Sequence, residues 1–183
     1  MANNIDYIIQ KINNIKNINI LELGVLRGDS TNKFLEICEK NDGYLTSIDI
    51  EDCSYVSKSR RWKFIHSSDD DFDKIDKIIS SKLDYTMSSI SGFDGLKPTI
   101  KIIKKTKSIA IANKESIICG WSLIEKELKK YKTKFIPVDS EHFSIWSIIK
   151  DIEPKNISEI IITASGGPFF SLKNKKIKKT PKL

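Results

Sequence analysis

The alternation of two kinds of segment constrains the fold of this chain more than any other feature. Short runs rich in β-branched residues are separated by longer amphipathic stretches, which is the pattern of repeated βα units. Such units form a parallel sheet that is covered by helices. The sequence therefore predicts an α/β fold, with a Rossmann-like, mostly parallel sheet and flanking helices. The expected strands are residues 18–24, 44–50, 62–66, 84–89, 107–112, 133–138 and 157–164.

Composition narrows the class of protein. A chain of 183 residues with 39% hydrophobic content has enough apolar side chains for a buried core. No apolar run approaches the roughly 20 residues that a membrane-spanning helix needs. The first residues, "MANNIDYIIQKINN", also lack the apolar centre and cleavage site of a signal peptide. We therefore expect a cytoplasmic protein without a membrane partner.

The net charge of +7 is distributed unevenly along the chain. Residues 1–82 contain slightly more acidic than basic residues, whereas the last eleven residues, "KNKKIKKTPKL", form a basic tail of low complexity. No aromatic residue in this tail could stack on a base, so no nucleic-acid partner is expected. The change of charge near residue 82 predicts a composite of two partial domains, residues 1–82 and 83–172, followed by the tail at 173–183.

The first motif with chemical content is "LELGVLRGDST", residues 21–31. Gly24 and Gly28 permit a tight turn between a strand and a helix, with close approach of the backbone to a ligand. Asp49 ends the next expected strand, where a carboxylate can accept hydrogen bonds from both hydroxyls of a ribose. The glycine turn and Asp49 together suit a nucleotide-like ligand. A glycine-rich turn is also common in Rossmann-like units that bind no nucleotide.

Residues 15–80 resemble the class I S-adenosylmethionine-dependent methyltransferases. The resemblance implies that Glu22, Gly24 and Gly28 form the first cofactor motif and that Asp49 binds the ribose. It would make S-adenosylmethionine the cofactor of the N-terminal half. The substrate-side acids of that family are not found after "HSSDDDFDKIDKII".

A second set of motifs occurs further along the chain. "IANKES" (111–116), "PVDSEH" (137–142) and "TASGGPF" (163–169) each follow an expected strand, where ligands bind in open α/β sheets. Together with "SSISGFDGLKPT" (88–99), they resemble the 1-deoxy-D-xylulose-5-phosphate reductoisomerase family over residues 83–172. The resemblance implies an oxidoreductase of isoprenoid biosynthesis that depends on NADPH and on Mg²⁺ or Mn²⁺. Its substrate is a sugar phosphate, which it rearranges and reduces to 2-C-methyl-D-erythritol 4-phosphate.

The two carboxylates of "PVDSEH" are candidate metal ligands. Asp139 and Glu141 offer hard oxygen atoms, and an ion held by few carboxylates keeps positions open for substrate oxygens. The stretch could also be only a capped helix start with exposed acids. The resemblance implies that both acids hold the metal, that Ser140 and Glu141 contact the substrate, and that Lys114 joins the two acids as a catalytic group.

The resemblance assigns roles to three further residues. Asn113 and Glu115 would contact NADPH, and Ser165 would bind the substrate, as would Lys114. A lysine at a helix start is unfavourable with the helix dipole, which favours a functional role for Lys114. His142 is expected to be a packing or exposed residue.

The chain also departs from this family. It lacks the glycine-rich NADPH fingerprint, and Asp49 would repel the 2′-phosphate of that cofactor. The family's third acidic metal ligand is not found, so we expect the isolated chain to convert its substrate poorly or not at all. Three hypotheses stay open, namely a reductoisomerase-derived chain, which leads, a methyltransferase of small molecules, and a fusion remnant without catalytic activity. The reductoisomerase resemblance also allows a homodimer.

Overall fold

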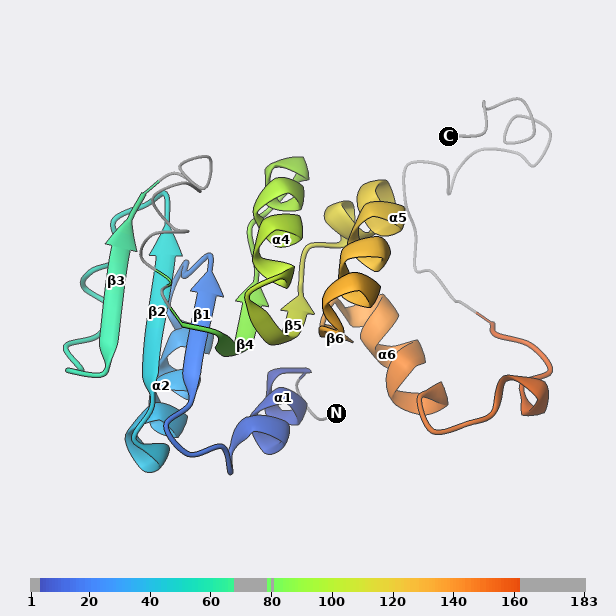
Figure 1. Ribbon diagram of the computed structural model, residues 1–183, viewed down its shortest axis with the longest axis horizontal. Coiled ribbons are helices and arrows are strands. Elements are labelled where there is room, and N and C mark those ends of the chain that lie inside the picture. Colours follow the sequence, from blue (N-terminus) through green and yellow to red (C-terminus); the bar gives the residue numbers. More distant parts are fainter. Residues whose placement is uncertain (1–3, 68–78, 80, 162–183) are drawn as a thin grey trace, which may run out of the picture. The chain divides into compact units, whose positions relative to one another are not determined.

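One six-stranded sheet organises the chain. The computed structural model describes residues 4–67, 79 and 81–161. All neighbouring strands pair in parallel, in the spatial order β3-β2-β1-β4-β5-β6 (Figure 1). The strands are β1 (Asn19–Leu23), β2 (Tyr44–Asp49), β3 (Trp62–His66), β4 (Leu83–Ser88), β5 (Thr106–Ile111) and β6 (Lys134–Pro137).

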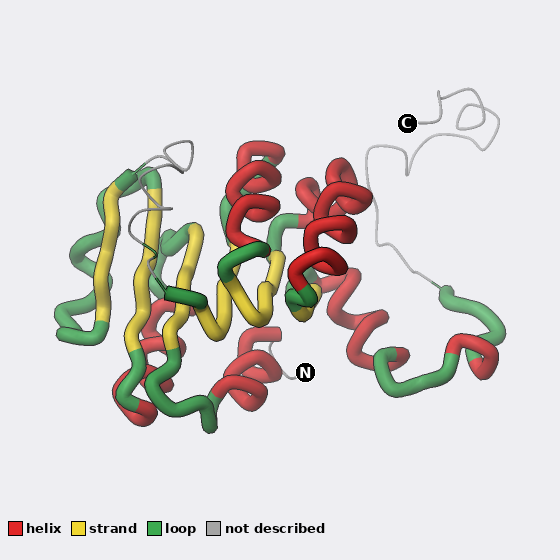
Figure 2. Tube along the Cα trace, in the orientation of Figure 1, coloured by secondary structure: helices red, strands yellow, loops and turns green. Residues whose placement is uncertain are grey.

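Helices connect several of these strands and cover both faces of the sheet (Figure 2). The α-helices are α1 (Asn4–Ile12), α2 (Asp29–Asn41), α4 (Leu96–Ile103), α5 (Lys114–Tyr131) and α6 (Ser140–Ile149). Short 3₁₀ helices occupy Phe93–Gly95 and Pro154–Asn156. From β1 the chain moves to β2 on one side, whereas from β4 it moves to β5 on the other. Because parallel crossovers are right-handed, α2 lies on the face opposite to α4 and α5.

The core consists of two apolar layers, one on each face of the sheet. Side chains along β1 alternate between them, since successive residues of a strand point to opposite faces. Ile20 packs with Phe34 of α2 and Ile8 of α1, whereas Leu21 packs with Ile102 and Ile124 of the helices α4 and α5. All of these side chains are almost completely buried. The two layers fix the register of β1 and hold the ends of the neighbouring strands at one edge.

The predicted α/β fold is confirmed. Six of the expected strands form within a residue or two of their predicted ends. The seventh is wrong in its described part, because residues 157–161 form no strand, while residues 162–164 lie outside the described residues. A short apolar run needs a neighbouring strand to pair with, and the sequence does not show whether one is present.

The predicted boundary at residue 82 falls within this sheet. β1 pairs with β4 from Ile20 and Tyr85 onwards, so strands from both expected pieces lie side by side. By compactness the chain separates into residues 1–147 and 148–183. In the second unit the described residues contain the 3₁₀ helix Pro154–Asn156 and are mostly exposed. The basic tail at 173–183 lies outside the described residues.

Among the helices that the structure describes, none combines the length and the apolar character that crossing a bilayer requires.

Candidate functional site

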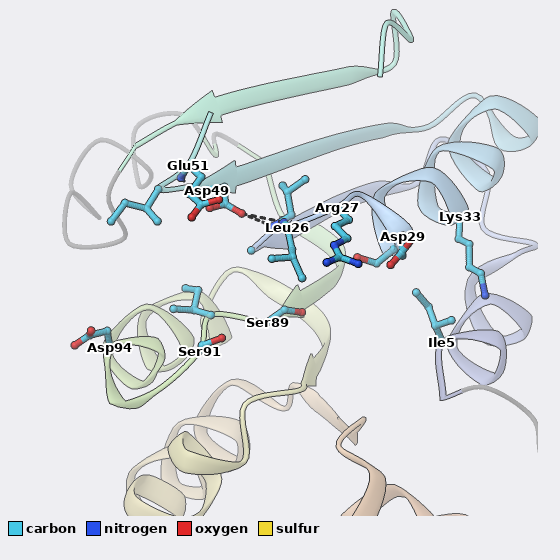
Figure 3. Close-up of a pocket in the computed structure, with 15 residues that line it drawn as sticks. Ile5, Leu26, Arg27, Asp29, Lys33, Asp49, Glu51, Ser89, Ser91 and Asp94 are labelled. Carbon is cyan, nitrogen blue, oxygen red and sulfur yellow. Dashed lines mark hydrogen bonds between the residues drawn. The ribbon is translucent and has the colours of Figure 1, made fainter. Parts of the chain in front are cut away.

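A cavity of about 630 Å³ opens at the carboxyl ends of β1, β2 and β4 (Figure 3). This is the point where the strand order reverses, and open parallel sheets bind their ligands at such points. Residues from three strand ends line the cavity, together with parts of α1 and α2. They are Ile5, Gly24, Val25, Leu26, Arg27, Asp29, Ser30, Lys33, Asp49, Ile50, Glu51, Ser89, Ile90, Ser91 and Asp94.

The turn between β1 and α2 forms the floor of the cavity. Gly24 and Gly28 have φ of 89° and 81°, a region that glycine enters without strain. A Cβ atom on Gly24 would lie 3.1 Å from the carbonyl carbon of Ser89, so glycine also lets the loop after β4 approach. Leu26 adopts a left-handed φ of 53°, and its side chain is 71% exposed. The structure thus confirms the expected tight turn.

Asp49 lies across this turn, as the sequence predicts, and its carboxylate is bonded to the backbone. Its Oδ2 accepts hydrogen bonds from the N–H groups of Val25 (2.6 Å) and Leu26 (3.2 Å). Its Oδ1 accepts one from the N–H of Glu51 at 3.0 Å. Burial alone would raise the pKa of Asp49, but these backbone N–H groups outweigh it and hold the pKa below its ordinary value. Asp49 therefore stays charged at neutral pH and fixes the turn.

Glu22 lies beneath the turn and does not line the cavity. Its carboxyl group is fully buried and accepts hydrogen bonds from the hydroxyls of Ser30, Thr31 (2.7 Å) and Ser47 (2.8 Å). Burial raises the pKa of Glu22, and the three hydroxyls offset part of that rise. These bonds tie β1 to β2 and to the first turn of α2, so Glu22 positions the turn from below.

Asn113 connects the cavity with the rest of the sheet edge. Its side-chain oxygen accepts a hydrogen bond from the N–H of Ser116 at 2.9 Å, which caps α5. Its amide nitrogen donates to the carbonyl oxygens of Ile90 and Gly92, in the loop that follows β4. A Cβ atom on Gly95 would lie 2.6 Å from this nitrogen, so glycine is needed there. The oxygen and the nitrogen of the Asn113 side chain are therefore both hydrogen-bonded to backbone groups of this chain.

Lys114 and Glu115 begin α5 directly after this cap. Both side chains are exposed at the carboxyl edge of the sheet. Within the described part of the chain, Lys114 forms no ion pair that would neutralise it at this helix start. A free ammonium group therefore lies next to the end of β5.

Asp139 follows β6 and is the residue before α6. Its side chain is only 6% exposed. Oδ1 accepts a hydrogen bond from the N–H of His142 at 3.0 Å and lies 2.7 Å from Nδ1 of the same histidine. Oδ2 is buried and has no hydrogen-bond partner among the residues that the structure describes. One oxygen thus caps α6, and the other is unpaired among the described residues.

The other candidate residues are described only in part. Ser140 and Glu141 form the first turn of α6, and their side chains lie outside what the structure describes. Ser165 lies outside the described residues altogether. Asn113, Lys114 and Asp139 follow adjacent strands and share the carboxyl edge of one sheet. Among the described side chains, no group of three or more His, Cys, Asp or Glu residues could hold a metal ion.

Several features of this edge were missed in the sequence. Glu51 and Ile50 line the cavity, and Asn113 holds the loop after β4. His142 is exposed, as expected, and the sequence reading missed only its contact with Asp139. The spacing of three residues at a helix start is a signal for that contact, because it brings a cap and the third helical residue together.

The strand order and the cavity at its reversal define a class, the Rossmann-like α/β proteins that bind ligands at the carboxyl edge of a parallel sheet. Comparison with known families is consistent with this class. The family "1-deoxy-D-xylulose 5-phosphate reductoisomerase" matches residues 8–120, and its C-terminal domain matches residues 135–182. The chain therefore belongs to the 1-deoxy-D-xylulose 5-phosphate reductoisomerase family.

Curated relatives with that name are similar over different shares of the chain. The protein from Pelagibacter ubique (strain HTCC1062) is 64% identical over 58% of this chain and 28% of its own length. The protein from Clostridium botulinum (strain Alaska E43) is 34% identical over 87% of this chain and 43% of its own length. The chain thus spans less than half the length of these relatives.

A solved structure shows the same fold. The reductoisomerase from Zymomonas mobilis in complex with NADPH superposes with a TM-score of 0.61 over 88% of this chain and 49% of the other. The sequence identity is 24%. A reductoisomerase bound to fosmidomycin and magnesium superposes with a TM-score of 0.53 at 20% identity.

Proposed function

We propose that residues from β4 to α6 supply metal-binding and substrate-binding groups of a 1-deoxy-D-xylulose 5-phosphate reductoisomerase. The relatives carry this name, and the reaction it denotes converts a sugar phosphate. The observation that carries the proposal is the buried Oδ2 of Asp139, which has no partner within the described chain. A buried carboxylate oxygen without a hydrogen bond is costly unless a ligand completes it.

A divalent cation fits this oxygen. Mg²⁺ and Mn²⁺ prefer carboxylate oxygens, and a solved reductoisomerase contains magnesium. We propose Asp139 and Glu141 as the metal ligands, with Ser140 and Ser165 as contacts to the substrate. When bound, the ion would polarise the substrate oxygens as a Lewis acid. The bond from Oδ1 to the N–H of His142 holds the Asp139 carboxylate in one orientation.

Lys114 is proposed as a substrate-binding and catalytic group. It precedes the rest of α5 at the same sheet edge, and its ammonium group is exposed. An ammonium group there can donate to a hydroxyl or phosphate oxygen and stabilise negative charge as it develops. Asn113 fixes the start of α5 and thereby the backbone position of Lys114.

Metal binding tests this proposal directly. Titration of the full chain with MnCl₂ in a calorimeter should give one saturable site, and Asp139→Asn should weaken it at least tenfold. Asp42→Asn is the matched control, because Asp42 is an exposed acid before β2, at the opposite edge of the sheet. Equal affinity in the wild type and Asp139→Asn, or an equal loss in Asp42→Asn, would overturn the assignment.

Substrate binding is measured separately. 1-Deoxy-D-xylulose 5-phosphate should bind more tightly with Mn²⁺ than with EDTA, and Lys114→Gln should reduce that affinity. Lys126→Gln, an exposed lysine further along α5, is the control. If Lys114→Gln and Lys126→Gln bind the sugar phosphate equally well, Lys114 has no role in substrate binding.

The family also implies NADPH, since a solved relative binds it. The cavity does not fit the 2′-phosphate of this cofactor. Asp49 and Glu51 are acidic residues at the tip of β2, where Rossmann-like proteins hold the adenosine ribose. We therefore assign no reaction step to NADPH in this cavity, and Asn113 and Glu115 remain proposed contacts to that cofactor further along the edge.

Methyl transfer from S-adenosylmethionine is a second candidate function of the N-terminal half. It is favoured by the two glycines with positive φ and by Asp49 across the turn from them. Gly24 and Asp49 would then line the cofactor site, whereas Glu22 and Gly28 would shape the turn without lining the cavity. Equilibrium dialysis with labelled S-adenosylmethionine tests it, and the absence of saturable binding would exclude it.

A further inference from the structure

We propose that the cavity at the carboxyl ends of β1, β2 and β4 binds a ribonucleoside whose two ribose hydroxyls are free. We further propose that this ligand carries no phosphate against the β1–α2 turn. The assignment concerns a different part of the sheet edge from Asp139, and it does not depend on reductoisomerase activity. It rests on three observations. The backbone N–H groups of the β1–α2 turn are already hydrogen-bonded, the described charges of the cavity are mostly acidic, and part of its lining is apolar.

The turn amides are the first observation. In dinucleotide-binding proteins, a glycine-rich turn and the helix that follows it direct N–H groups at a pyrophosphate. Here the N–H groups of Val25 and Leu26 already donate to Oδ2 of Asp49. A phosphate at these two amides would have to displace a carboxylate that is charged at neutral pH. The chain's own acid therefore takes the place of a ligand anion.

The charged side chains of the cavity also disfavour a phosphorylated ligand. Among the described residues that line it, the acids Asp29, Asp49, Glu51 and Asp94 outnumber the basic residues Arg27 and Lys33. Lys33 is also paired with Asp6 at 2.8 Å. Figure 3 shows Asp49 and Glu51 together at the β2 side, with Lys33 towards α2. A ligand with several phosphates would be repelled, whereas a neutral or cationic nucleoside would not.

The acids at the tip of β2 suit a ribose. A carboxylate at this position accepts hydrogen bonds from the 2′-hydroxyl, whereas a basic residue there accommodates a 2′-phosphate. The carboxylate of Asp49 already accepts hydrogen bonds from backbone N–H groups. The exposed Glu51, two residues further on, offers an additional acceptor. A 2′-phosphate would therefore meet two acids.

The apolar residues of the cavity suit a base. Leu26 and Ile50 are 71% and 64% exposed, and both line the cavity together with Ile90. Exposed apolar side chains that gather in a cavity gain stability when a flat ring covers them. The cavity of about 630 Å³ is large enough for a nucleoside.

Calorimetry on the full chain with three small probes tests nucleoside binding, the effect of a 2′-phosphate and the effect of a 5′-diphosphate separately. Adenosine should bind, adenosine 2′-monophosphate should bind at least tenfold more weakly, and adenosine 5′-diphosphate should also bind more weakly. Absence of saturable adenosine binding, or equal or tighter binding of either phosphorylated probe, would overturn the proposal. Neither result would affect Mn²⁺ binding at Asp139, so failure of one proposal is distinguishable from failure of the other.

Two variants test the role of Glu51. Glu51→Gln should weaken adenosine binding, and Glu51→Arg should raise the affinity for adenosine 2′-monophosphate at least tenfold. Glu36→Gln, an exposed acid on α2 that does not line the cavity, is the matched control for the charge change. If Glu51→Gln behaves like Glu36→Gln, and Glu51→Arg gains no affinity for the 2′-phosphate, the ribose assignment is wrong.

Discussion

Asp49 and Asp139 are both acids at the carboxyl end of a parallel strand, yet their hydrogen bonding differs. Asp49 receives hydrogen bonds from backbone N–H groups on both of its oxygens, and these bonds hold the β1–α2 turn. Asp139 has one oxygen bonded to the start of α6 and one buried oxygen without a partner in the described part of the chain. The same residue type is thus part of the scaffold at one place and a candidate ligand at the other, and hydrogen-bond satisfaction distinguishes the two.

Asn113 joins these two regions, and its removal should have the largest effect. Asn113→Ala removes the cap of α5 and both bonds to the loop after β4, and it leaves the buried carbonyl group of Ile90 and the partly buried one of Gly92 without this donor. We expect the free energy of unfolding to fall by about 2–4 kcal/mol. Urea denaturation measures this, with Asn32→Ala on the exposed side of α2 as control. A loss no larger than that of Asn32→Ala would show that the two regions are held independently.

The second largest effect is expected from metal binding, which should depend on Asp139 and not on Asp49. With Mn²⁺ at 100 times its dissociation constant, the wild-type chain should gain about 2.7 kcal/mol of stability. EDTA should remove this gain. Asp49→Asn should keep it and Asp139→Asn should lose it, because, of these two acids, Asp139 is the one with a buried oxygen that has no partner among the described residues. Thermal unfolding with and without Mn²⁺ is the measurement, and a gain that persists in Asp139→Asn would contradict the comparison.

Asp49 should show its scaffold role in the pH dependence of stability. The pKa of Asp49 is lowered in the folded chain, so its contribution is present above the unfolded pKa of about 3.9 and is lost as the pH falls through the folded value. Asp49→Asn should therefore be less stable than the wild type by about 1–2 kcal/mol at pH 7. The difference should shrink below pH 4. A difference that is constant from pH 7 to pH 2 would show that charge is not involved.

The smallest effect is expected at the opposite edge of the sheet. Lys107 pairs with Asp84 at 2.7 Å, and the lysine side chain is 62% exposed. Lys107→Met keeps most of the aliphatic stem and should cost less than about 1 kcal/mol, with a smaller effect at high salt. Chemical denaturation at low and high salt checks this. A larger, salt-independent loss would show that charges at the amino edge matter as much as those at the carboxyl edge.

Periodicity was enough to predict most of the fold. Runs such as residues 44–50 and 107–112 are strands because apolar β-branched side chains at this spacing can be buried on both faces of a parallel sheet. The motifs also placed Gly24, Asp49, Asn113 and Asp139 at strand ends. Since parallel strands all end at the same edge, their meeting there follows from the sequence once the sheet is assumed.

Only the tertiary structure decided what each of these side chains contacts. Nothing in the sequence states that Asp49 would bond the amides of Val25 and Leu26, or that Asn113 would hold the carbonyls of Ile90 and Gly92. These contacts span 21 to 24 residues along the chain and exist only after β1, β2, β4 and β5 have assembled. A residue type fixes which hydrogen bonds are available, whereas the packing of strands distant in sequence fixes which of them are made. That is why the sequence identified the acids, and the structure distinguished the satisfied Asp49 from the unsatisfied Asp139.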